Sequence, residues 1–185
     1  KGEGENFEQF ENLDNKFLLF HGSKISNFMG IMSQGLRVAP PEAPKTGYMF
    51  GKGVYFADML QKSFNYCNDH NSSPDGSKFM LLCEVGVGKS YKLTDAKYMD
   101  EPPAGYSSVQ GLGQRGPCYG KCFSFPEGYK VPRGKYLDYE YEKSIQDKVY
   151  LRHNEFMIYK SEAEKQNPVT NGLPSESNPG QIKMR

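Results

Sequence analysis

The alternation of apolar and polar stretches along the chain predicts short strands separated by loops and a few helices. The first apolar run, from Phe17 to Phe20, is followed by His21, Gly22 and Ser23. A run of this length without helical period favours a buried strand that ends in a turn. We therefore expect His21 at the end of the first strand.

Apolar side chains recur at helical spacing directly after this strand, and Gly35 supplies a stop. The pattern predicts a helix of about three turns that packs through one face, with Ser23 and Ser26 available as caps. The apolar residues that define its packed face are Ile25, Phe28, Met29 and Met32.

A loop rich in Pro and Gly, from Val38 to Gly53, leads to a second strand and helix. Residues 53–56 predict the strand, and residues 58–67 predict a helix with Asp58 at its beginning. The side of this helix that we expect to pack carries Leu60, Phe64 and Cys67.

The second half of the chain supplies the remaining strands. Residues 79–87 form the most apolar stretch and predict a core strand, and residues 89–93 predict another strand or an extension of the same one. Little periodicity is visible over residues 100–135, and strand-like spacing returns over residues 136–141 and 150–159.

The end of the chain, residues 161–185, is polar and rich in Pro, Asn and Ser, and it predicts a flexible tail. Residues 1–160 then make one domain, which is an ordinary size for a folded core. Because the chain begins at Lys1 and not at a methionine, we expect a longer polypeptide upstream.

Composition narrows the classes of partner. The net charge is +1, with 23 basic and 22 acidic residues spread along the chain, so we expect this segment to make no direct contact with nucleic acid. No apolar run is long enough to span a membrane, and no membrane association is expected. The 4 cysteines at irregular spacing fit free thiols in a reducing, intracellular compartment.

A metal site is not expected. Cys118 and Cys122 could ligate a metal together with the distant Cys67 and His70, but their spacing fits no common zinc pattern. Buried thiols are therefore favoured. The chain also lacks the Rossmann glycine fingerprint and the phosphate-binding loop GxxxxGK(S/T).

Three features carry candidate chemistry, namely the histidine of HGS, the tyrosine of GKGVYF and the glutamate of HNEFMIY. Each alone is more often structural. Their joint pattern is distinctive, because a run of about fifty residues is reinforced by NEFMIY about a hundred residues later. This run, FLLFHGSKISNFMGIMSQGLRVAPPEAPKTGYMFGKGVYFADMLQKSFNYC, closely resembles the poly(ADP-ribose) polymerase family, and in particular its DNA-damage-responsive members.

The resemblance implies an α+β chain with the ADP-ribosyltransferase fold, in which two mainly antiparallel β-sheets pack together with flanking helices. We expect this fold to be incomplete at both ends. Residues 1–20 are too few for the family's first strand and regulatory helical domain, and KSEAEKQNPVTNGLPS offers no strand after NEFMIY. The resemblance also implies a nuclear protein whose regulatory or DNA-binding domains lie upstream or in a partner chain.

The resemblance further implies an enzyme that cleaves the nicotinamide bond of NAD+ and transfers ADP-ribose to protein acceptors and growing chains, without a metal. The family's His-Tyr-Glu signature falls at His21, Tyr55 and Glu155. Glu155 would stabilise the cationic ribose, hydrogen-bond its 2′-hydroxyl and help to activate the acceptor hydroxyl. Lys62 would contact the acceptor or the reacting ribose.

The donor site that the resemblance implies draws on both strand-helix units. Gly22 would hold the nicotinamide amide through its backbone, where a side chain would crowd the ligand, and Ser63 would add a hydroxyl. Tyr66 and Tyr55 would enclose the ring, and His21 would hydrogen-bond the adenosine ribose. The adenosine and pyrophosphate side, with the loop that covers the donor, would be formed by Ser23, Asn27, Arg37 and Tyr48. Alternatively, Ser23 and Asn27 serve only as helix caps.

Two other functions stay open at this point. The first is a catalytically quiet ADP-ribosyltransferase-like module with a structural or scaffolding role in a larger assembly, for which the shortened sheet argues. The second is a mono-transferase. The intact signature argues for activity, and the glutamate at position 155, in place of an apolar residue, favours polymer formation by analogy with the family.

Overall fold

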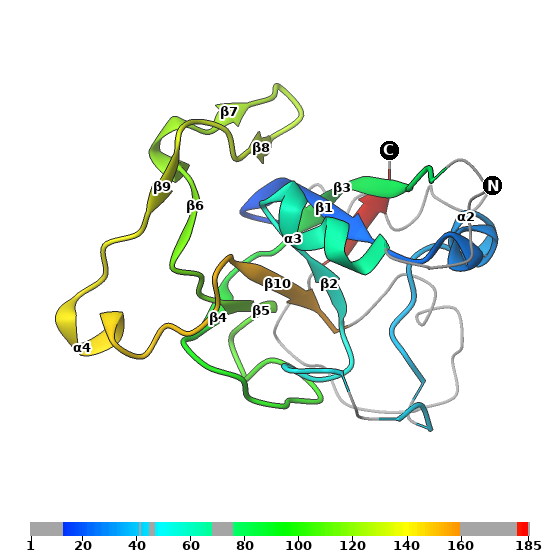
Figure 1. Cartoon of the computed structure of the whole chain (residues 1–185), viewed down its shortest axis with the longest axis horizontal. Coiled ribbons are helices and arrows are strands. Elements are labelled where there is room, and N and C mark those ends of the chain that lie inside the picture. The colour runs from blue at the N-terminus through cyan, green and yellow to red at the C-terminus, as the bar shows by residue number, and fades with distance from the viewer. Residues whose placement is uncertain (1–12, 41, 45–46, 68–75, 160–180, 185) are drawn as a thin grey trace.

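The computed structural model describes residues 13–40, 42–44, 47–67, 76–159 and 181–184. Over these residues the fold is α+β, with two larger β-sheets packed together and a small third sheet beside them (Figure 1). Most strand pairs are antiparallel, and the helices are few and short. The fold class predicted from the sequence is therefore confirmed.

The largest sheet has five strands in the order β11-β3-β1-β8-β7. They are β11 (Gln181–Met184), β3 (Met80–Gly86), β1 (Lys16–Gly22), β8 (Tyr129–Val131) and β7 (Phe123–Ser124). The second sheet has four strands in the order β2-β10-β5-β4. They are β2 (Val54–Phe56), β10 (Glu155–Ile158), β5 (Ser108–Gly111) and β4 (Ser90–Leu93).

The remaining elements lie at the edges of these two sheets. Strands β6 (Arg115–Pro117) and β9 (Tyr136–Asp138) pair with each other as the third sheet. The α-helices are α2 (Phe28–Gln34), α3 (Leu60–Phe64) and α4 (Lys143–Gln146). Short 3-10 turns occur at η1 (Ile25–Asn27), η2 (Asn65–Cys67) and η3 (Tyr119–Lys121).

Strand β1 is longer than its apolar run predicts. It pairs antiparallel with β3 from Lys16, opposite Gly86, to Gly22, opposite Met80. His21 therefore lies at the end of the strand, as the sequence predicts, and Gly22 is the last residue of the strand instead of part of the turn. The apolar run marks only the part of β1 that is needed for the core, whereas the pairing with β3 sets its full length.

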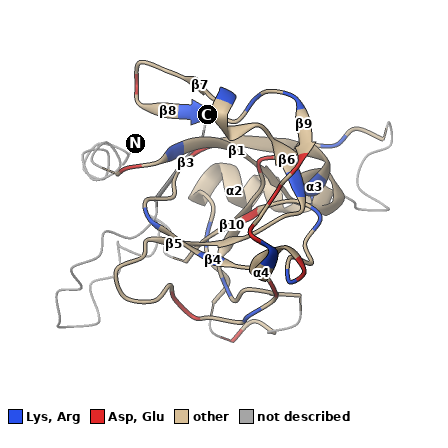
Figure 2. Ribbon diagram, turned by 90° about the vertical axis from the view of Figure 1, so that its left-hand side faces the viewer, with Lys and Arg blue, Asp and Glu red and all other residues tan. Residues whose placement is uncertain are grey.

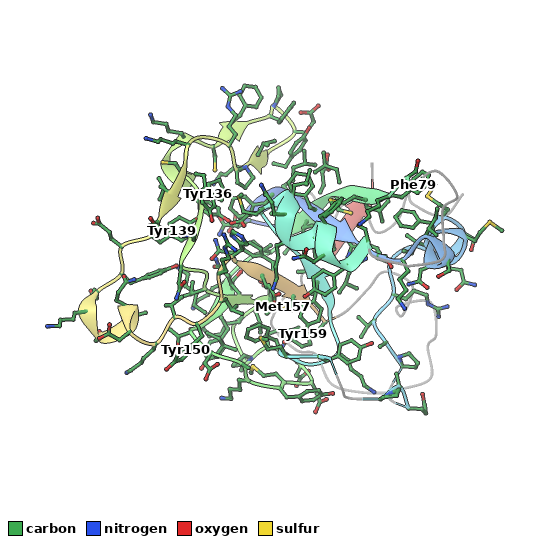
Figure 3. All side chains as sticks on the ribbon, viewed as in Figure 1. Phe79, Tyr136, Tyr139, Tyr150, Met157 and Tyr159 are labelled. Carbon is green, nitrogen blue, oxygen red and sulfur yellow. The ribbon has the colours of Figure 1, made fainter. Side chains whose placement is uncertain are left out.

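A core between the two larger sheets holds them together. Leu19 of β1 and Val85 of β3 meet Phe156 and Ile158 of β10 in one buried cluster. Met157, which points to the opposite side of β10, belongs to a second buried cluster with Tyr159 (Figure 3). Strand β10 is thus buried on both faces, which explains why the sequence there is continuously apolar rather than alternating.

A backbone bridge joins the two sheets directly beside the core. Phe20 of β1 and Ala57, just after β2, exchange two hydrogen bonds, with N···O distances of 2.8 and 3.0 Å. Because backbone bonds leave little freedom in relative position, the C-terminal half of β1 is fixed against the end of β2.

The predicted packed face of the first helix is wrong in part. Met29 and Met32 are 85% and 71% exposed, whereas Ile31, which the pattern left out, is buried. The segment begins as the 3-10 turn η1 before it becomes α2, and this tighter turn shifts the angular positions of the following side chains. Phe28 and Ile31, three residues apart, form the inner face instead.

The predicted packed side of the second helix is also wrong in part. α3 begins at Leu60 and not at Asp58, and Leu60 and Phe64 are both largely exposed. Its buried residue is Ser63, because the helix lies directly against the backbone of β1 and leaves room only for a small side chain. Cys67 is buried as expected.

The sequence gives little sign of five strands, since β6, β7 and β8 also lie within residues 100–135. β5, at residues 108–111, lies within the stretch that shows little periodicity, yet it pairs with both β10 and β4. β11, at residues 181–184, pairs with β3 and falls in the predicted flexible tail, so that prediction and the expectation of no strand after NEFMIY are wrong there. Residues 161–180, the rest of the predicted tail, lie outside the described residues.

Positions of Lys and Arg and positions of Asp and Glu are interspersed along the ribbon (Figure 2). Over the described part of the chain, lysines and arginines form no continuous stripe in this view. None of the helices in that part is long and apolar enough to cross a bilayer.

The first prediction concerns the core between the sheets. Leu19→Ala should lower the free energy of unfolding by about 2 to 5 kcal/mol, because it removes a fully buried side chain where the two sheets meet. Chemical denaturation measures the loss. Leu18→Ala, on the other face of β1 and only half-buried, is the matched control and should lose less. Equal losses would contradict the assignment of the core to this face.

Candidate active site

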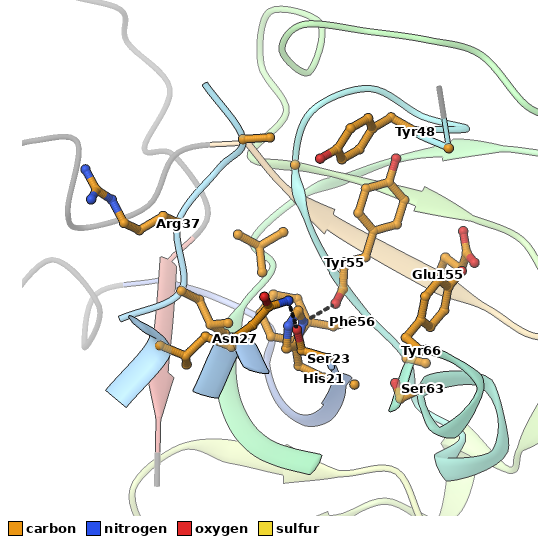
Figure 4. Close-up of a pocket in the computed structure, with 18 of the residues that line it drawn as sticks. His21, Ser23, Asn27, Arg37, Tyr48, Tyr55, Phe56, Ser63, Tyr66 and Glu155 are labelled. Atoms are coloured by element: carbon orange, nitrogen blue, oxygen red, sulfur yellow. Dashed lines mark hydrogen bonds between the residues drawn. The ribbon is translucent and has the colours of Figure 1, made fainter. Parts of the chain in front are cut away.

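One cavity of about 760 Å³ brings together every residue that the sequence singles out for donor binding or catalysis. It lies between β1, α2, β2 and α3, and the first residue of β10 reaches it (Figure 4). Its volume is in the range of cofactor-sized sites, about 300 to 1,000 Å³. The predicted residues that line it are His21, Gly22, Ser23, Asn27, Arg37, Tyr48, Tyr55, Lys62, Ser63, Tyr66 and Glu155.

The imidazole of His21 is held by the backbone of β2. Its Nδ1 lies 2.8 Å from the carbonyl oxygen of Tyr55 (Figure 4). A carbonyl only accepts, so Nδ1 carries the proton and donates it, which leaves Nε2 as the acceptor of a neutral ring. Burial lowers the pKa of His21, and the hydrogen bond to Tyr55 only partly offsets this effect.

Gly22 is required by the close approach of α3 to β1. A Cβ atom at this position would lie 1.8 Å from the carbonyl oxygen of Ser63, so no side chain fits. The hydroxyl of Ser63 donates to the carbonyl oxygen of Phe20 at 2.9 Å. The structure therefore gives a reason for the glycine within the protein itself, in addition to the crowding of a ligand that the sequence suggests.

Tyr55 presents its ring, and not its hydroxyl, as a wall of the cavity. The hydroxyl donates to the carbonyl oxygen of Gly51 at 2.8 Å and accepts from the backbone N–H of Phe50 at 3.0 Å. Burial raises the pKa of Tyr55 far above its ordinary value. The phenol is thus a neutral anchor for the loop before β2, and the ring of Tyr48 lies beside it with centroids 6.5 Å apart.

Gly51 allows this loop to reach back to the phenol. Its φ of 100° lies in the region that favours glycine, and a Cβ atom would lie 1.7 Å from the carbonyl oxygen of Met99. The backbone conformation therefore explains why Gly51 is needed in the GYMFGKG segment, whereas the sequence indicates only that this segment is a loop.

Glu155 and Lys62 form a buried ion pair at one end of the cavity. The side chain of Glu155 is 5% exposed and that of Lys62 is 22% exposed. A buried carboxylate without a partner is strongly unfavourable, so Lys62 stabilises the charged form of Glu155 where it faces the cavity. Glu155 is the first residue of β10 and is buried, although a glutamate in a strand is more often exposed.

Tyr66 lies next to this ion pair (Figure 4). Burial raises the pKa of its phenol, and the negative charge of Glu155 raises it further. About half of the side chain is exposed to the cavity and to solvent. A neutral, partly exposed aromatic ring beside a carboxylate is suited to binding a flat, electron-poor ring.

The far end of the cavity is polar and more open. The side-chain N–H of Asn27 donates to the hydroxyl oxygen of Ser23 at 3.0 Å. Asn27 occupies the N-cap position of α2 without a capping hydrogen bond from its side chain, and the N-cap of η1 is Lys24 and not Ser23. Arg37 donates to Gln34 at 2.7 Å and points away from the centre of the cavity (Figure 4).

Several residues that line the cavity were not singled out from the sequence. Gly30, Ile31 and Gln34 continue the line from Asn27 at spacings of three and four residues, which is one face of a helix. This periodicity is visible in the sequence and could have identified them. The contributions of Leu36 and Met49 depend on the loop conformation and carry no comparable signal, whereas Phe56 lies in β2 next to Tyr55.

The cysteines considered as metal ligands are not gathered at one place in the described residues. Cys67 is buried and its thiol donates to the carbonyl oxygen of Phe79 at 3.1 Å. Within the described residues no three His, Cys, Asp or Glu side chains are grouped so that they could hold a metal ion. His70 lies outside the described residues.

Comparison with known proteins gives a family match over most of the chain. The sequence model of the poly(ADP-ribose) polymerase catalytic domain matches residues 1–166. The chain is 48% identical over 149 residues to poly(ADP-ribose) polymerase 1 of Arabidopsis thaliana, an alignment that covers 80% of this chain and 14% of that protein.

Two other relatives are similar to this chain over a comparable length. Poly(ADP-ribose) polymerase 2 of Arabidopsis thaliana is 44% identical over 161 residues, covering 86% of this chain and 24% of that protein. Poly(ADP-ribose) polymerase 1 of Gallus gallus is 45% identical over 159 residues, covering 86% of this chain and 15% of that protein. The chain thus spans less than a quarter of the length of these relatives.

The second prediction concerns Gly22. Gly22→Ala should lower the free energy of unfolding by about 1 to 3 kcal/mol, because the new methyl group must push α3 away from β1. Thermal or chemical unfolding measures the loss. Gly30→Ala is the control, since nothing lies within 4 Å of its added Cβ, and it should be neutral or stabilising by up to about 1 kcal/mol. A neutral Gly22→Ala would contradict the contact.

The third prediction concerns the protonation of His21. Its imidazole should titrate below the ordinary value of 6.5 when followed by NMR in the folded protein. Because the unfolded chain takes up this proton at a higher pH than the folded chain, the contribution of His21 lowers stability as the pH falls below about 6.5. His21→Gln should remove that part of the pH dependence. A folded-state pKa above the unfolded value would contradict the burial of the ring.

Proposed function

The chain belongs to the poly(ADP-ribose) polymerase catalytic-domain family, and we propose that it cleaves NAD+ and transfers ADP-ribose to protein acceptors and to growing chains. The observation that carries the proposal is the ion pair of Glu155 and Lys62 at the end of a cavity that also holds His21, Tyr55 and Tyr66. These are the residue types that the reaction needs, and they come from three separated stretches of the chain.

The substrate NAD+ fits the chemistry of the cavity. Its nicotinamide ring is electron-poor and flat, and it would lie between the aromatic faces of Tyr55 and Tyr66. The Ser63 hydroxyl already donates its proton to Phe20, so its oxygen remains to accept from the carboxamide N–H of nicotinamide. Gly22 would hold the same carboxamide through its backbone.

The adenosine half of NAD+ would extend toward α2. The neutral His21 ring offers Nε2 as an acceptor for a ribose hydroxyl. Ser23 and Asn27 present a hydroxyl and an amide at the open end of the cavity, where adenosine would be in contact with solvent. Arg37 would reach the pyrophosphate only by breaking its hydrogen bond with Gln34, and Tyr48 would cover the donor from the loop.

Glu155 would supply the electrostatic part of catalysis. When the bond between the ribose C1′ and the nicotinamide nitrogen breaks, its electron pair leaves with nicotinamide, and positive charge develops on C1′ and the ring oxygen. A preorganised carboxylate near that charge lowers the barrier most when water is excluded, as it is around the buried Glu155. In elongation, Glu155 would accept a hydrogen bond from the attacking ribose hydroxyl and help to remove its proton.

Lys62 would orient Glu155 for these two tasks through their ion pair. The ammonium is partly exposed to the cavity, so it can also contact an acceptor group that enters beside Glu155. An ion pair held between α3 and β10 would need little reorganisation during the reaction.

Partners and location follow from the family as part of the same proposal. Protein side chains would be the first acceptors, and regulatory or DNA-binding domains elsewhere in a longer polypeptide, or in a partner chain, would control the site. A nuclear location in the DNA-damage response fits such a protein. The argument for a catalytically quiet scaffold came from a fold expected to be incomplete at both ends, and β11 weakens the part of that argument that concerns the end of the chain.

The fourth prediction tests the reaction. The full-length protein, incubated with labelled NAD+, should release nicotinamide and form polymer on protein acceptors. Glu155→Gln should lower elongation by roughly a hundredfold or more and leave single ADP-ribose units, because the neutral amide can neither stabilise the cation nor take up a proton. Polymer of unchanged length in Glu155→Gln would contradict the role of this carboxylate, and single units from the unmodified protein would identify a mono-transferase.

Matched variants separate binding from folding. Tyr66→Ala should weaken NAD+ binding without unfolding the protein, since about half of this side chain is already exposed. Glu142→Gln and Tyr150→Ala change the same residue types at exposed positions away from the cavity and should behave like the unmodified protein. If no labelled product forms under any condition, the proposed activity is wrong.

A further inference from the structure

A buried polar network lies behind the cavity and plays no part in the mechanism above. Its centre is Asp58, which is 5% exposed and lies between β2 and α3. One carboxylate oxygen, Oδ2, accepts from the hydroxyl of Tyr119 and from the side-chain amide of Asn154, both at 2.7 Å. The other oxygen, Oδ1, is buried and accepts no hydrogen bond from another residue.

The burial of the Asp58 carboxylate is, by itself, unfavourable for the stability of the protein. A buried carboxylate loses its hydration, and here neutral donors and not a cation offset that loss. A well-packed apolar or amide side chain would usually be at least as stable. The reason for burying this carboxylate therefore lies in the segments that the network connects.

Asn154 connects Asp58 to the beginning of β10. It is 2% exposed and directly precedes Glu155. Its Nδ2 donates to Asp58, and its Oδ1 accepts from the backbone N–H of Gly113 at 2.8 Å. Both ends of the amide are thus used, so the position of the backbone next to Glu155 depends on both contacts.

The backbone around Gly113 lies directly against the backbone of His153 and Asn154. A Cβ atom on Gly113 would lie 2.4 Å from the backbone nitrogen of Asn154, so the two segments are in direct contact. The carbonyl oxygen of Gly113 accepts from the hydroxyl of Tyr141 at 2.8 Å. Asn154 is therefore held from one side by this segment and from the other by Asp58.

Two contacts join the same two segments at adjacent points. Asp58 lies two residues before α3 and Lys62 lies within it, four residues further along the chain, while Asn154 and Glu155 are neighbours in sequence. The hydrogen bond from Asn154 to Asp58 therefore runs beside the ion pair of Glu155 with Lys62. Any shift of β10 relative to α3 must change both contacts.

We propose that Asp58 is a positioning residue, which acts through Asn154 to hold β10 in register with α3 so that Glu155 meets Lys62 in the cavity. The inference rests on the proposed function for its effect on activity. Its geometric part concerns only the ion pair and can be tested in the absence of activity. Tyr119 anchors Asp58 from η3, so the positioning also depends on the part of the chain after β6.

The ionisation of Asp58 agrees with this geometry. Burial raises the pKa of Asp58 to about 6, and the hydrogen bonds from Asn154 and Tyr119 lower it only in part. The nearby phenols of Tyr119, Tyr139 and Tyr141 have raised pKa values, first because they are buried and also because they face this carboxylate. The carboxylate therefore accepts from Tyr119 and Asn154, whereas the Tyr139 hydroxyl accepts from Asn154 at 3.4 Å and donates to Pro117, and the Tyr141 hydroxyl donates to Gly113.

The fifth prediction uses a reciprocal exchange in the full-length protein. Asn154→Asp places a second carboxylate against Asp58 and should break the contact. We expect kcat for ADP-ribose transfer to fall by at least about tenfold near pH 8, while the Kd for NAD+ stays within about threefold. The defect should become smaller as the pH is lowered toward about 6, because the two carboxyl groups can then share a proton.

The double variant Asp58→Asn with Asn154→Asp restores one donor and one acceptor in reversed positions, and kcat should return to within about threefold of the unmodified protein. Asp58→Asn alone keeps an acceptor oxygen and should have a small effect. Ser108→Ala removes a buried hydrogen bond to Val87 away from the cavity and is the control for loss of stability alone. A double variant as impaired as Asn154→Asp, or a kcat for Asn154→Asp equal to that of Ser108→Ala, would overturn the proposal.

A second readout separates this inference from the proposed function. The Lys62 ammonium group, followed by ¹⁵N NMR, should give a signal protected by its ion pair in the unmodified protein, lose it in Asn154→Asp and regain it in the double variant. If the unmodified protein transfers no ADP-ribose, the proposed function is wrong, and this NMR series still decides the positioning role. An unchanged Lys62 signal in Asn154→Asp would refute that role whether or not the protein is active.

Discussion

The burial of the Glu155 carboxylate is the constraint on which the rest of the structure depends. A charge in the interior is less unfavourable where a partner of opposite sign is held in place, and Lys62 of α3 is the partner of Glu155. Strand β10 is buried on both faces, so its first residue cannot move toward water to relieve the cost. The surrounding elements must therefore fix the position of α3 relative to β10 closely enough for Lys62 to meet Glu155.

Backbone contacts between the sheets meet this requirement. Phe20 and Ala57 exchange two hydrogen bonds, the His21 ring is held by Tyr55, and Gly22 allows α3 to lie directly against β1. These contacts involve main-chain atoms, which have no rotamers to adjust. The cavity thus forms at the junction of the two sheets, where a small error in packing would separate its two ends.

Prediction from the sequence succeeds where the signal is local. The apolar runs at residues 17–20 and 79–87 identify β1 and β3, because strands buried in a core need such runs. It fails where long-range pairing decides the structure. β5 and β11 carry no distinctive pattern and become strands through their neighbours, β10 and β4 in one case and β3 in the other. The outward position of Met29 likewise follows from the 3-10 turn before α2.

The sequence by itself determined the family and the candidate residues of the site, since the joint pattern around His21, Tyr55 and Glu155 is recognisable before any coordinates are known. Only the tertiary structure decided how they act together. The pairing of Glu155 with Lys62, the neutral tautomer of His21 and the tie from Asp58 to Asn154 each join residues that are distant in the chain. The physical reason is that a motif fixes the type and order of side chains, whereas charge, protonation and hydrogen bonding depend on neighbours that only folding supplies.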